Sequence, residues 1–254
     1  DFDTVLRIAQ EKGYAEKDPT LDVKGLDALH KIAILSFLCF GKLPDIKATF
    51  CEGIETISME DIQYAQENGL TIKLLAILKK NKNRLDLRVH PTFVPDEHPL
   101  AKIDDVLNAV LVHTEKGGPF LFSGLGAGGT PTAISVLSDV VDVCRGGVRQ
   151  GFVESKARLP FADIDDLKTA YYIRFYAQDR PGVLASISKI LAEHMISIDS
   201  VTQKSTQEET KKKYVPIIIL THMAREKDVR AAVAKIDALE MIKPPTQIIR
   251  WEEL

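Results

Sequence analysis

Residues 171–203 read YYIRFYAQDRPGVLASISKILAEHMISIDSVTQ, and this stretch decides the fold of the last third of the chain. Its aromatic and β-branched opening, 171–177, predicts a strand, and the DRPG at 179–182 predicts a turn. Residues 183–194 carry apolar side chains at helical spacing on one face, so they predict a helix. A second strand is expected at 196–203.

The remaining residues complete a four-stranded pattern. After a polar loop we expect a strand at 214–221, a helix at 225–238 and a final strand at 241–251. The order is βαββαβ, which is the ferredoxin-like arrangement. In such a sheet the second strand lies at an edge, where unpaired backbone groups invite pairing with another copy of the chain.

The first part of the chain, 1–145, mixes helices and strands without a repeat. Helical periodicity covers 3–12, 25–40, 59–69 and 101–105, and strand-like runs cover 71–80, 84–94, 108–114 and 119–124. Residues 146–169 have little periodicity and open with two glycines, so they predict a linker. The expected fold class is α+β, a mixed α/β region at 1–145 followed by the linker and a ferredoxin-like domain at 170–254.

Composition sets limits on the function. The chain has 254 residues, of which 45% are hydrophobic, and a formal net charge of -3, which gives no electrostatic reason to expect nucleic acid. The longest uncharged apolar run, 32–40, is far shorter than the roughly 20 residues of a membrane helix, so no membrane contact is expected. Three cysteines without C-x-x-C spacing, and histidines without metal spacing, predict no disulfide framework and no metal site. A reducing cytoplasm fits best.

A first chemical constellation lies at 9–31, AQEKGYAEKDPTLDVKGLDALHK, which is rich in carboxylates. Asp27 and Lys31 are separated by four residues, so they share one face of the expected helix. The apolar run IAILSFL at 32–38 predicts that the second half of this helix is buried, with Lys31 at the edge of the buried zone. A lysine partly removed from water beside carboxylates suits proton transfer to an oxygen atom, while further carboxylates hold a substrate ammonium.

A purely structural interpretation of the same residues stays open. Asp22 could be a helix N-cap, and Asp18 followed by Pro19 could be a turn. The Asp27–Lys31 pair could be a surface ion pair that contributes about 0.3–0.5 kcal/mol.

The pattern Ala9-x-x-x-Gly13-Tyr14-Ala15-x-x-Asp18-Pro19-x-x-Asp22-Val23-x-Gly25-x-Asp27-x-x-x-Lys31 resembles the signature segment of homoserine dehydrogenase, with every fixed position present. The resemblance continues through EGI at 52–54, HPLA at 98–101, NAV at 108–110 and GLGAGGTPTA at 124–133. It therefore covers the chain from its first residue to about 145, which would be a catalytic region for substrate binding and dimerisation.

The resemblance implies a role for each carboxylate and for the lysine. Lys31 would be the proton donor and acceptor at the substrate oxygen, Asp27 its catalytic companion, and Glu16 and Asp22 would hold the amino and hydroxyl groups of the amino acid. The implied reaction is reduction of aspartate semialdehyde to homoserine by NADPH or NADH, in the biosynthesis of threonine, methionine and isoleucine. In this family the cofactor, NADP or NAD, is bound mainly by a domain that precedes the signature segment.

The stretch GLGAGG at 124–129 satisfies G-x-G-x-x-G but does not fit a dinucleotide-binding unit. Such a unit needs a second strand ending in an acidic residue about 20 residues further on, whereas Asp139 and Asp142 lie within the expected helix and the linker follows. By resemblance this loop instead borders the active site and is adjacent to the cofactor. The cofactor-adjacent residues would be Gly124, Gly126, Gly128, Gly129 and Thr130. Alternatively, the glycines serve only a tight strand-to-helix turn.

Residues 171–252 resemble an ACT regulatory domain, through the turn into the first helix and through ISIDSVTQK in the second strand. Gly182 would permit close backbone approach, and the free N–H groups at the helix start would receive the carboxylate of an amino-acid effector, threonine by resemblance. The effector-binding residues would be Asp179, Arg180, Pro181, Gly182, Val183 and Leu184. Alternatively, DRPG is only a turn and the domain is a dimerisation device.

Two hypotheses of different kinds follow. The first is a homoserine dehydrogenase region with an appended regulatory domain, which acts on a small-molecule substrate as a homodimer or homotetramer. The second is a non-enzymatic amino-acid sensor that reuses the scaffold for dimerisation. The sequence opens without an initiating Met, so we expect a fragment of a longer chain that is inactive in hydride transfer by itself.

Overall fold

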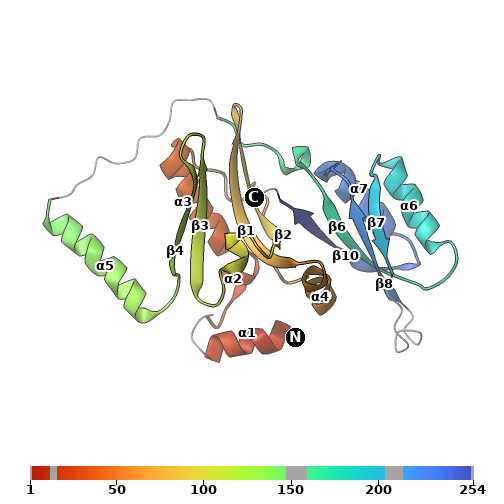
Figure 1. Cartoon of the computed structure of the whole chain (residues 1–254), viewed down its shortest axis with the longest axis horizontal. Coiled ribbons are helices and arrows are strands. Elements are labelled where there is room, and N and C mark those ends of the chain that lie inside the picture. Colours follow the sequence, from red (N-terminus) through yellow and green to blue (C-terminus); the bar gives the residue numbers. More distant parts are fainter. Residues whose placement is uncertain (1, 12–15, 147–158, 204–213, 253–254) are drawn as a thin grey trace.

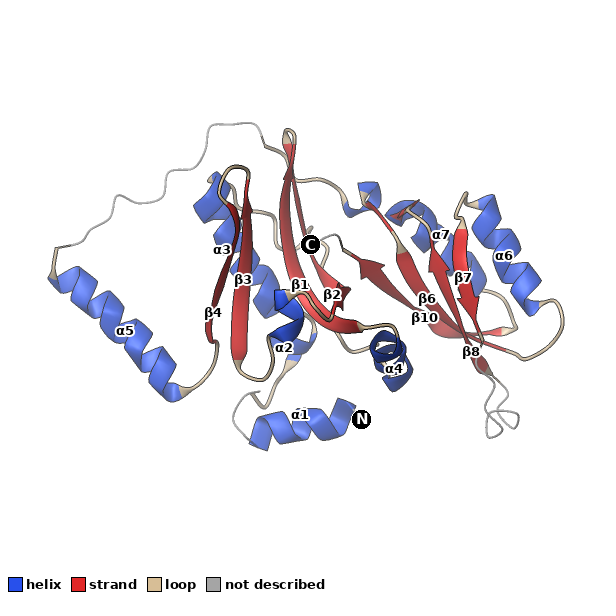
Figure 2. Cartoon of the chain, in the orientation of Figure 1, coloured by secondary structure: helices blue, strands red, loops and turns tan. Residues whose placement is uncertain are grey.

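The computed structural model describes residues 2–11, 16–146, 159–203 and 214–252. The first region contains α1 (Phe2–Glu11), α2 (Thr20–Val23), α3 (Leu26–Phe40), α4 (Met59–Glu67), β1 (Leu70–Asn81), β2 (Arg84–Pro95), η1 (Pro99–Lys102), β3 (Leu107–Thr114), β4 (Gly118–Leu125) and α5 (Gly129–Cys144). The second contains η2 (Ile164–Asp166), β5 (Lys168–Thr169), β6 (Tyr171–Ala177), α6 (Val183–Glu193), β7 (Ile198–Thr202), β8 (Val215–Thr221), β9 (Ala224–Arg225), α7 (Glu226–Asp237) and β10 (Ile242–Trp251). Figures 1 and 2 show the β1–β2 hairpin in the middle of the molecule, with β3, β4 and α5 on one side and β10, β6, β8 and β7 on the other.

The C-terminal region has the expected βαββαβ order, with its strands arranged β10-β6-β8-β7. Side chains of β6 alternate between the two faces of the sheet. Tyr171, Ile173 and Phe175 pack with α6 and α7 in one core, whereas Tyr172 packs with α4 on the opposite face. The prediction that the second strand lies at an edge is confirmed, because β7 pairs only with β8 in this sheet.

The sheet continues beyond β10 into the first region. The sequence did not predict this extension. The strand order is β1-β2-β10-β6-β8-β7, because β10 pairs in parallel with β2 through Arg250 opposite Thr92 and Trp251 opposite Phe93. The rings of Phe93 and Trp251 lie 5.9 Å apart across this junction. One continuous sheet therefore joins the two regions.

The long hairpin of β1 and β2 supports the helix that carries the signature residues. The two strands pair in register from Leu70 opposite Pro95 to Asn81 opposite Arg84. Leu29 and Ile32 of α3 pack with Leu87 and Val89 of β2 in a separate core cluster. This packing fixes one face of α3 on the sheet.

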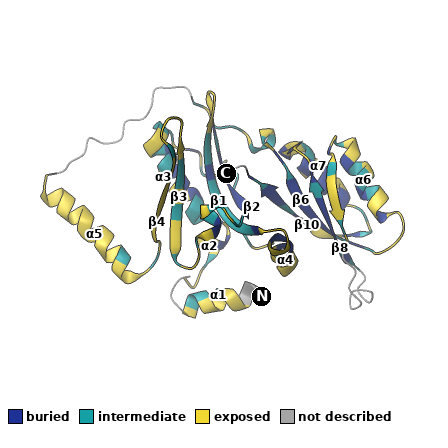
Figure 3. Cartoon of the chain, in the orientation of Figure 1, coloured by how far each residue is buried: buried dark blue, intermediate teal, exposed yellow. Residues whose placement is uncertain are grey.

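The hairpin of β3 and β4 and the helix α5 contrast with the rest of the chain. The two strands form a sheet of their own, and no residue of α5 is buried (Figure 3). Large apolar side chains face solvent here, including Phe122, which is 63% exposed, and Leu137, which is 62% exposed. Within the described ranges, no helix combines the length and apolarity needed to cross a bilayer.

Three local predictions need correction. The helix expected at 101–105 is the 3-10 turn η1, because Pro99 favours a turn start and Ile103 is already extended. The helix expected at 25–40 begins at Leu26, after Gly25. The end of the expected linker is ordered as η2 and β5, because Pro160 and Ala162 hydrogen-bond the backbone of Leu85. The linker residues 147–158 lie outside the described residues.

Candidate functional site

The described signature residues from Asp18 to Lys31 run through α2 and into α3. Gly25 stands at the junction of the two helices with φ +76°, a left-handed conformation that glycine adopts without strain, and it turns the chain from one helix into the next. Asp27 and Lys31 then lie one turn apart on α3, and Lys31 Nζ is 2.5 Å from Asp27 Oδ2. The predicted sharing of one helix face is confirmed.

The expected burial around Lys31 is wrong for this chain. The Lys31 side chain is 57% exposed, and the Asp27 side chain is 42% exposed. Only the face of α3 toward β1 and β2 is buried, whereas Ile34 on the outer side is 59% exposed. The apolar run at 32–38 therefore covers more of the helix surface than the hairpin can bury.

The structural alternatives for the carboxylates are partly excluded. Asp22 is not an N-cap, because the N-cap positions of α2 and α3 are Pro19 and Gly25. Asp18 does form a local turn, since its Oδ1 accepts hydrogen bonds from Thr20 N at 3.1 Å and Thr20 Oγ1 at 2.5 Å. These bonds lower the pKa of the Asp18 carboxyl.

Glu16 and Asp22 are both exposed, Glu16 before α2 and Asp22 within it. The backbone carbonyl of Glu16 accepts a hydrogen bond from Gln10 Nε2 at 3.0 Å, which links the segment to α1. The carbonyl of Asp22 accepts from Gly25 N at 3.1 Å. Their carboxylates are thus open to a ligand from the solvent side.

A loop at 51–54, which contains the EGI motif, packs against the signature segment at Val23 and Lys24. Ile54 N donates to Val23 O at 2.9 Å, and Cys51 Sγ donates to Lys24 O at 3.2 Å. A Cβ on Gly53 would lie 2.2 Å from Val23 O and 2.6 Å from Lys24 Cα, so only glycine fits. The packing of this motif against the signature segment was not predicted from the sequence.

The glycine loop between β4 and α5 is a turn with tight local packing. Gly126 N donates to Val106 O at 2.8 Å, and a Cβ on Gly126 would meet Asn108 Nδ2 at 1.7 Å. Gly128 is the N-cap of α5 with φ +119°. Gly124, Gly129 and Thr130 are exposed.

The loop does not form a dinucleotide-binding unit in the described parts of the chain. β4 pairs only with β3, in antiparallel register, and Asp139 and Asp142 lie within α5 as predicted. Among the described residues, no hydrogen bond or ion pair joins the glycine loop to the Asp27–Lys31 pair. That this loop borders the active site stays a prediction.

The six expected effector residues lie at the start of α6. Gly182 is the N-cap, with φ +91°, and a Cβ there would meet nothing within 4 Å. Its left-handed conformation therefore favours glycine within this chain, and the close approach of an effector to its backbone stays a prediction. Val183 is buried in the core, whereas Leu184 and the four residues before Val183 (Asp179, Arg180, Pro181 and Gly182) are exposed.

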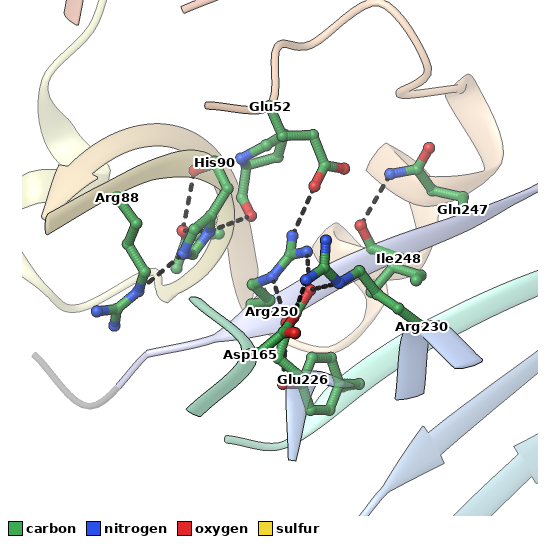
Figure 4. A network of polar contacts seen from close by, with 12 residues as sticks. Glu52, Arg88, His90, Asp165, Glu226, Arg230, Gln247, Ile248 and Arg250 are labelled. Atoms are coloured by element: carbon green, nitrogen blue, oxygen red, sulfur yellow. Dashed lines mark hydrogen bonds and ion pairs between the residues drawn. The ribbon is translucent and has the colours of Figure 1, made fainter. Parts of the chain in front are cut away.

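A buried ion-pair network, which sequence reasoning missed, joins the two regions (Figure 4). The Arg250 guanidinium, 2% exposed, donates to Glu226 through Nε at 2.9 Å and Nη2 at 2.6 Å. Its third nitrogen, Nη1, donates to Glu52 at 2.8 Å, and Arg250 also lies over the Phe50 ring at 4.8 Å. Arg250 thus connects β10, α7 and the 51–54 loop.

A second buried pair joins α4 to β6. Arg174 donates to both carboxylate oxygens of Asp61, at 2.7 and 2.9 Å, and Tyr172 Oη donates to Asp61 Oδ1 at 2.7 Å. The Asp61 side chain is fully buried and the Arg174 side chain is 4% exposed. Burial and the neighbouring Asp61 charge raise the pKa of the Tyr172 hydroxyl.

His90 lies between two buried arginines. Arg88 Nε donates to His90 Nε2 at 3.2 Å, so the ring proton is on Nδ1, which donates to Pro91 O at 3.0 Å. Burial, with the Arg250 and Arg88 charges, lowers the pKa of His90 well below its ordinary value. The folded chain therefore favours the neutral form of His90.

One small hollow lies where the 52–56 loop meets β10. Its volume is about 210 Å³, and its lining includes Glu52, Glu55 and Thr246. Within the described residues, no group of three His, Cys, Asp or Glu side chains could hold a metal ion.

These features define a class of protein: an α/β region with an open carboxylate–lysine cluster, fused through one sheet to an ACT-type βαββαβ domain. Family models match both parts, the homoserine dehydrogenase family at residues 1–141 and the ACT domain at residues 171–240. The chain belongs to the homoserine dehydrogenase family and carries an ACT domain.

The relatives agree with this assignment. Homoserine dehydrogenases of Neisseria gonorrhoeae and Synechocystis are 39% and 40% identical over 100% and 98% of this chain. A crystal structure of a homoserine dehydrogenase from Thiobacillus denitrificans has 43% identity, covers 99% of this chain and superposes with a TM-score of 0.84. The chain spans 60% of each of the two curated relatives and 58% of the solved one.

Proposed function

We propose that the chain supplies the substrate-binding and regulatory parts of a homoserine dehydrogenase, with a catalytic region at 1–145, a linker at 146–169 and a regulatory domain at 170–254. The observation that carries the proposal is the Asp27–Lys31 pair, 2.5 Å apart on α3, together with the exposure of Glu16 and Asp22 earlier in the same signature segment. The family match over residues 1–141 supports it.

In this proposal Lys31 donates a proton to the oxygen of aspartate semialdehyde as that oxygen becomes the hydroxyl of homoserine. Asp27 contacts the Lys31 ammonium and orients it, and it holds the positive charge in place until the proton leaves. Glu16 and Asp22 expose carboxylates that bind the substrate amino and hydroxyl groups. The product enters threonine, methionine and isoleucine synthesis in the cytoplasm.

A reduced nicotinamide dinucleotide, NADPH or NADH, supplies the hydride when it is bound. The residues of this chain fit a bordering role only, because Gly128 and Gly129 are exposed at the start of α5, while in the described residues no strand after that helix pairs with β4. Gly124, Gly126 and Thr130 complete that border.

The exposed surfaces support a homodimer or homotetramer. β7 presents an unpaired strand edge, and the β3–β4 hairpin exposes Phe120 at 48% and Phe122 at 63%. Sedimentation of the chain is expected to show a dimer, and a monomer at all concentrations would contradict this part of the proposal.

Replacing the lysine in the full-length protein tests the catalytic role. Lys31→Ala is expected to lower turnover about 10²–10⁴-fold with folding retained, the range for loss of a general acid or base. His30→Ala is the matched control, because His30 is the exposed neighbour on the same helix and has no role in the proposal. Turnover of Lys31→Ala close to that of wild type would remove Lys31 from the mechanism.

The ACT domain is proposed to bind an amino acid, threonine, at the start of α6. Calorimetry on the 254-residue chain, with its dimer confirmed first, is expected to give heat with threonine and to lose it in Arg180→Ala. Lys189→Ala is the control, since Lys189 is exposed on α6 away from the turn. Absence of heat with threonine, methionine, isoleucine and lysine would leave only a dimerisation role.

A further inference from the structure

The 51–54 loop contacts both the signature segment and the ACT domain through neighbouring residues. On one side, Gly53 packs directly on the Val23–Lys24 backbone, and Ile54 N donates to Val23 O. On the other side, the Glu52 carboxylate receives Nη1 of Arg250 at 2.8 Å. The loop is thus held between Asp22's helix and strand β10.

Arg250 is a rigid anchor for the loop. Glu226 binds its guanidinium through two nitrogens and is itself fully buried. The position of the arginine is therefore held independently of Glu52. The Glu52 side chain is only 30% exposed, which strengthens a charge-assisted hydrogen bond relative to one in open solvent. The bond adds a side-chain anchor to the backbone hydrogen bonds that pair the loop with Val89, where Glu52 N donates to Val89 O at 2.9 Å.

The position of the 51–54 loop is linked to Asp22, a proposed substrate-binding residue, through a short chain of backbone hydrogen bonds. Asp22 precedes Val23, whose carbonyl accepts from Ile54, and Asp22 O accepts from Gly25 N at the turn into α3. Leu29 N then donates to Gly25 O at 3.0 Å in the first turn of that helix. A shift of the loop would move the turn at Gly25, and with it the start of α3.

We propose that Glu52 is a positioning residue: through Arg250 it fixes the 51–54 loop and so the placement of Asp22 for substrate binding. Its kinetic consequence rests on the proposed function, whereas its structural consequence does not. The carboxylate acts at a distance from the reacting atoms, so it affects substrate binding more than the chemical step.

The test uses Glu52→Gln, because this change removes one charge and leaves the Arg250–Glu226 pair intact to hold the fold. Glu55→Gln is the matched control, because Glu55 is an exposed glutamate in the residue after this loop. In the full-length protein, Glu52→Gln is expected to raise the homoserine KM about tenfold while kcat changes by less than about threefold. Glu55→Gln is expected to leave both unchanged.

Hydrogen exchange on the 254-residue chain gives a readout without activity. Glu52→Gln is expected to speed exchange of the Ile54 and Gly25 amides about tenfold, while the Phe175 amide in the ACT core keeps its rate. An inactive wild-type full-length protein would refute the proposed function. The hydrogen-exchange measurement would still test whether Glu52 positions the 51–54 loop. Unchanged exchange at Ile54 and Gly25, or an unchanged KM in an active protein, would overturn the inference.

Discussion

The ACT domain and the β3–β4–α5 segment use the same kinds of residue in opposite ways. In the ACT domain, Phe175, Ile187 and Leu191 are fully buried between the sheet and its two helices. In the β3–β4–α5 segment, Phe122, Leu137 and Val143 are 63%, 62% and 76% exposed. One region covers its large apolar side chains within the chain, whereas the other leaves them exposed.

The ACT domain is joined to the first region at a junction that contains buried ion pairs as well as apolar packing. Arg174–Asp61, Arg250–Glu52 and Arg88–Glu252 each join an ACT strand or the C-terminal residues to the first region. A buried pair needs both partners, because removal of one leaves an unpaired charge out of water. The junction is therefore specific and sensitive to single changes.

The largest stability effect is expected at this junction. Asp61→Ala leaves the Arg174 guanidinium and the Tyr172 hydroxyl without their buried partner, so it should lower the free energy of unfolding by about 3–5 kcal/mol. Urea unfolding measures the change, with Gln63→Ala on the exposed face of α4 as control. A loss below about 1 kcal/mol would mean that the regions are joined by packing alone.

Two isoleucine-to-alanine substitutions, one in each region, compare the two regions directly. Ile187→Ala in the ACT core should cost about 2–5 kcal/mol, because the residue is fully buried and its removal leaves a cavity. Ile134→Ala in α5, where the residue is 60% exposed, should change stability by less than about 0.5 kcal/mol. Equal costs in urea unfolding of the 254-residue chain would contradict the difference between the regions.

The supporting loop should be less costly to disturb than the core but still intolerant of a side chain. Gly53→Ala places a methyl group against Val23 O and the Lys24 backbone, which must move apart. We expect a loss of about 1–3 kcal/mol, the range for overpacking. Gly69→Ala is a control for the loss of a glycine with φ +67°, because a Cβ there meets no neighbour. If thermal unfolding showed a larger loss of stability for Gly69→Ala than for Gly53→Ala, this interpretation of the loop would be wrong.

The sequence predicted the parts of the fold that depend on local periodicity. The βαββαβ order, the edge position of β7 and the Asp27–Lys31 spacing follow from patterns within a few turns or strands. The exposure of Lys31 did not follow, because an apolar helix run does not say how much of its surface its own chain covers.

The junction could not be predicted, because its partners are remote in sequence. Arg250 and Glu52 are 198 residues apart, and an arginine between apolar residues near the end of a strand resembles an ordinary exposed position. The parallel pairing of β10 with β2 extends over two residue pairs, too few to leave a periodic signal. Only the packed chain brings these groups together.

The smallest effect concerns pH and arises from His90 in this junction. The charged groups that face its ring are Arg88 and Arg250, and the Phe50 ring lies 6.4 Å away. The pKa of His90 is lowered well below 6.5 in the folded chain, so below pH 6.5 the unfolded chain binds a proton that the folded chain does not. The stabilisation is complete above pH 6.5 and is lost as the pH falls toward the folded pKa.

Each pH unit in that window should cost about 1 kcal/mol from this residue, since one proton contributes at most about 1.4 kcal/mol per unit. His90→Gln keeps a polar side chain and removes the titration, so its unfolding free energy should fall less steeply between pH 6.5 and 5.5 than that of wild type. His222→Gln is the control, because its side chain is 61% exposed. Urea unfolding at the two pH values measures both slopes, and parallel slopes for His90→Gln and wild type would show that His90 takes up its proton equally in the folded and unfolded chain.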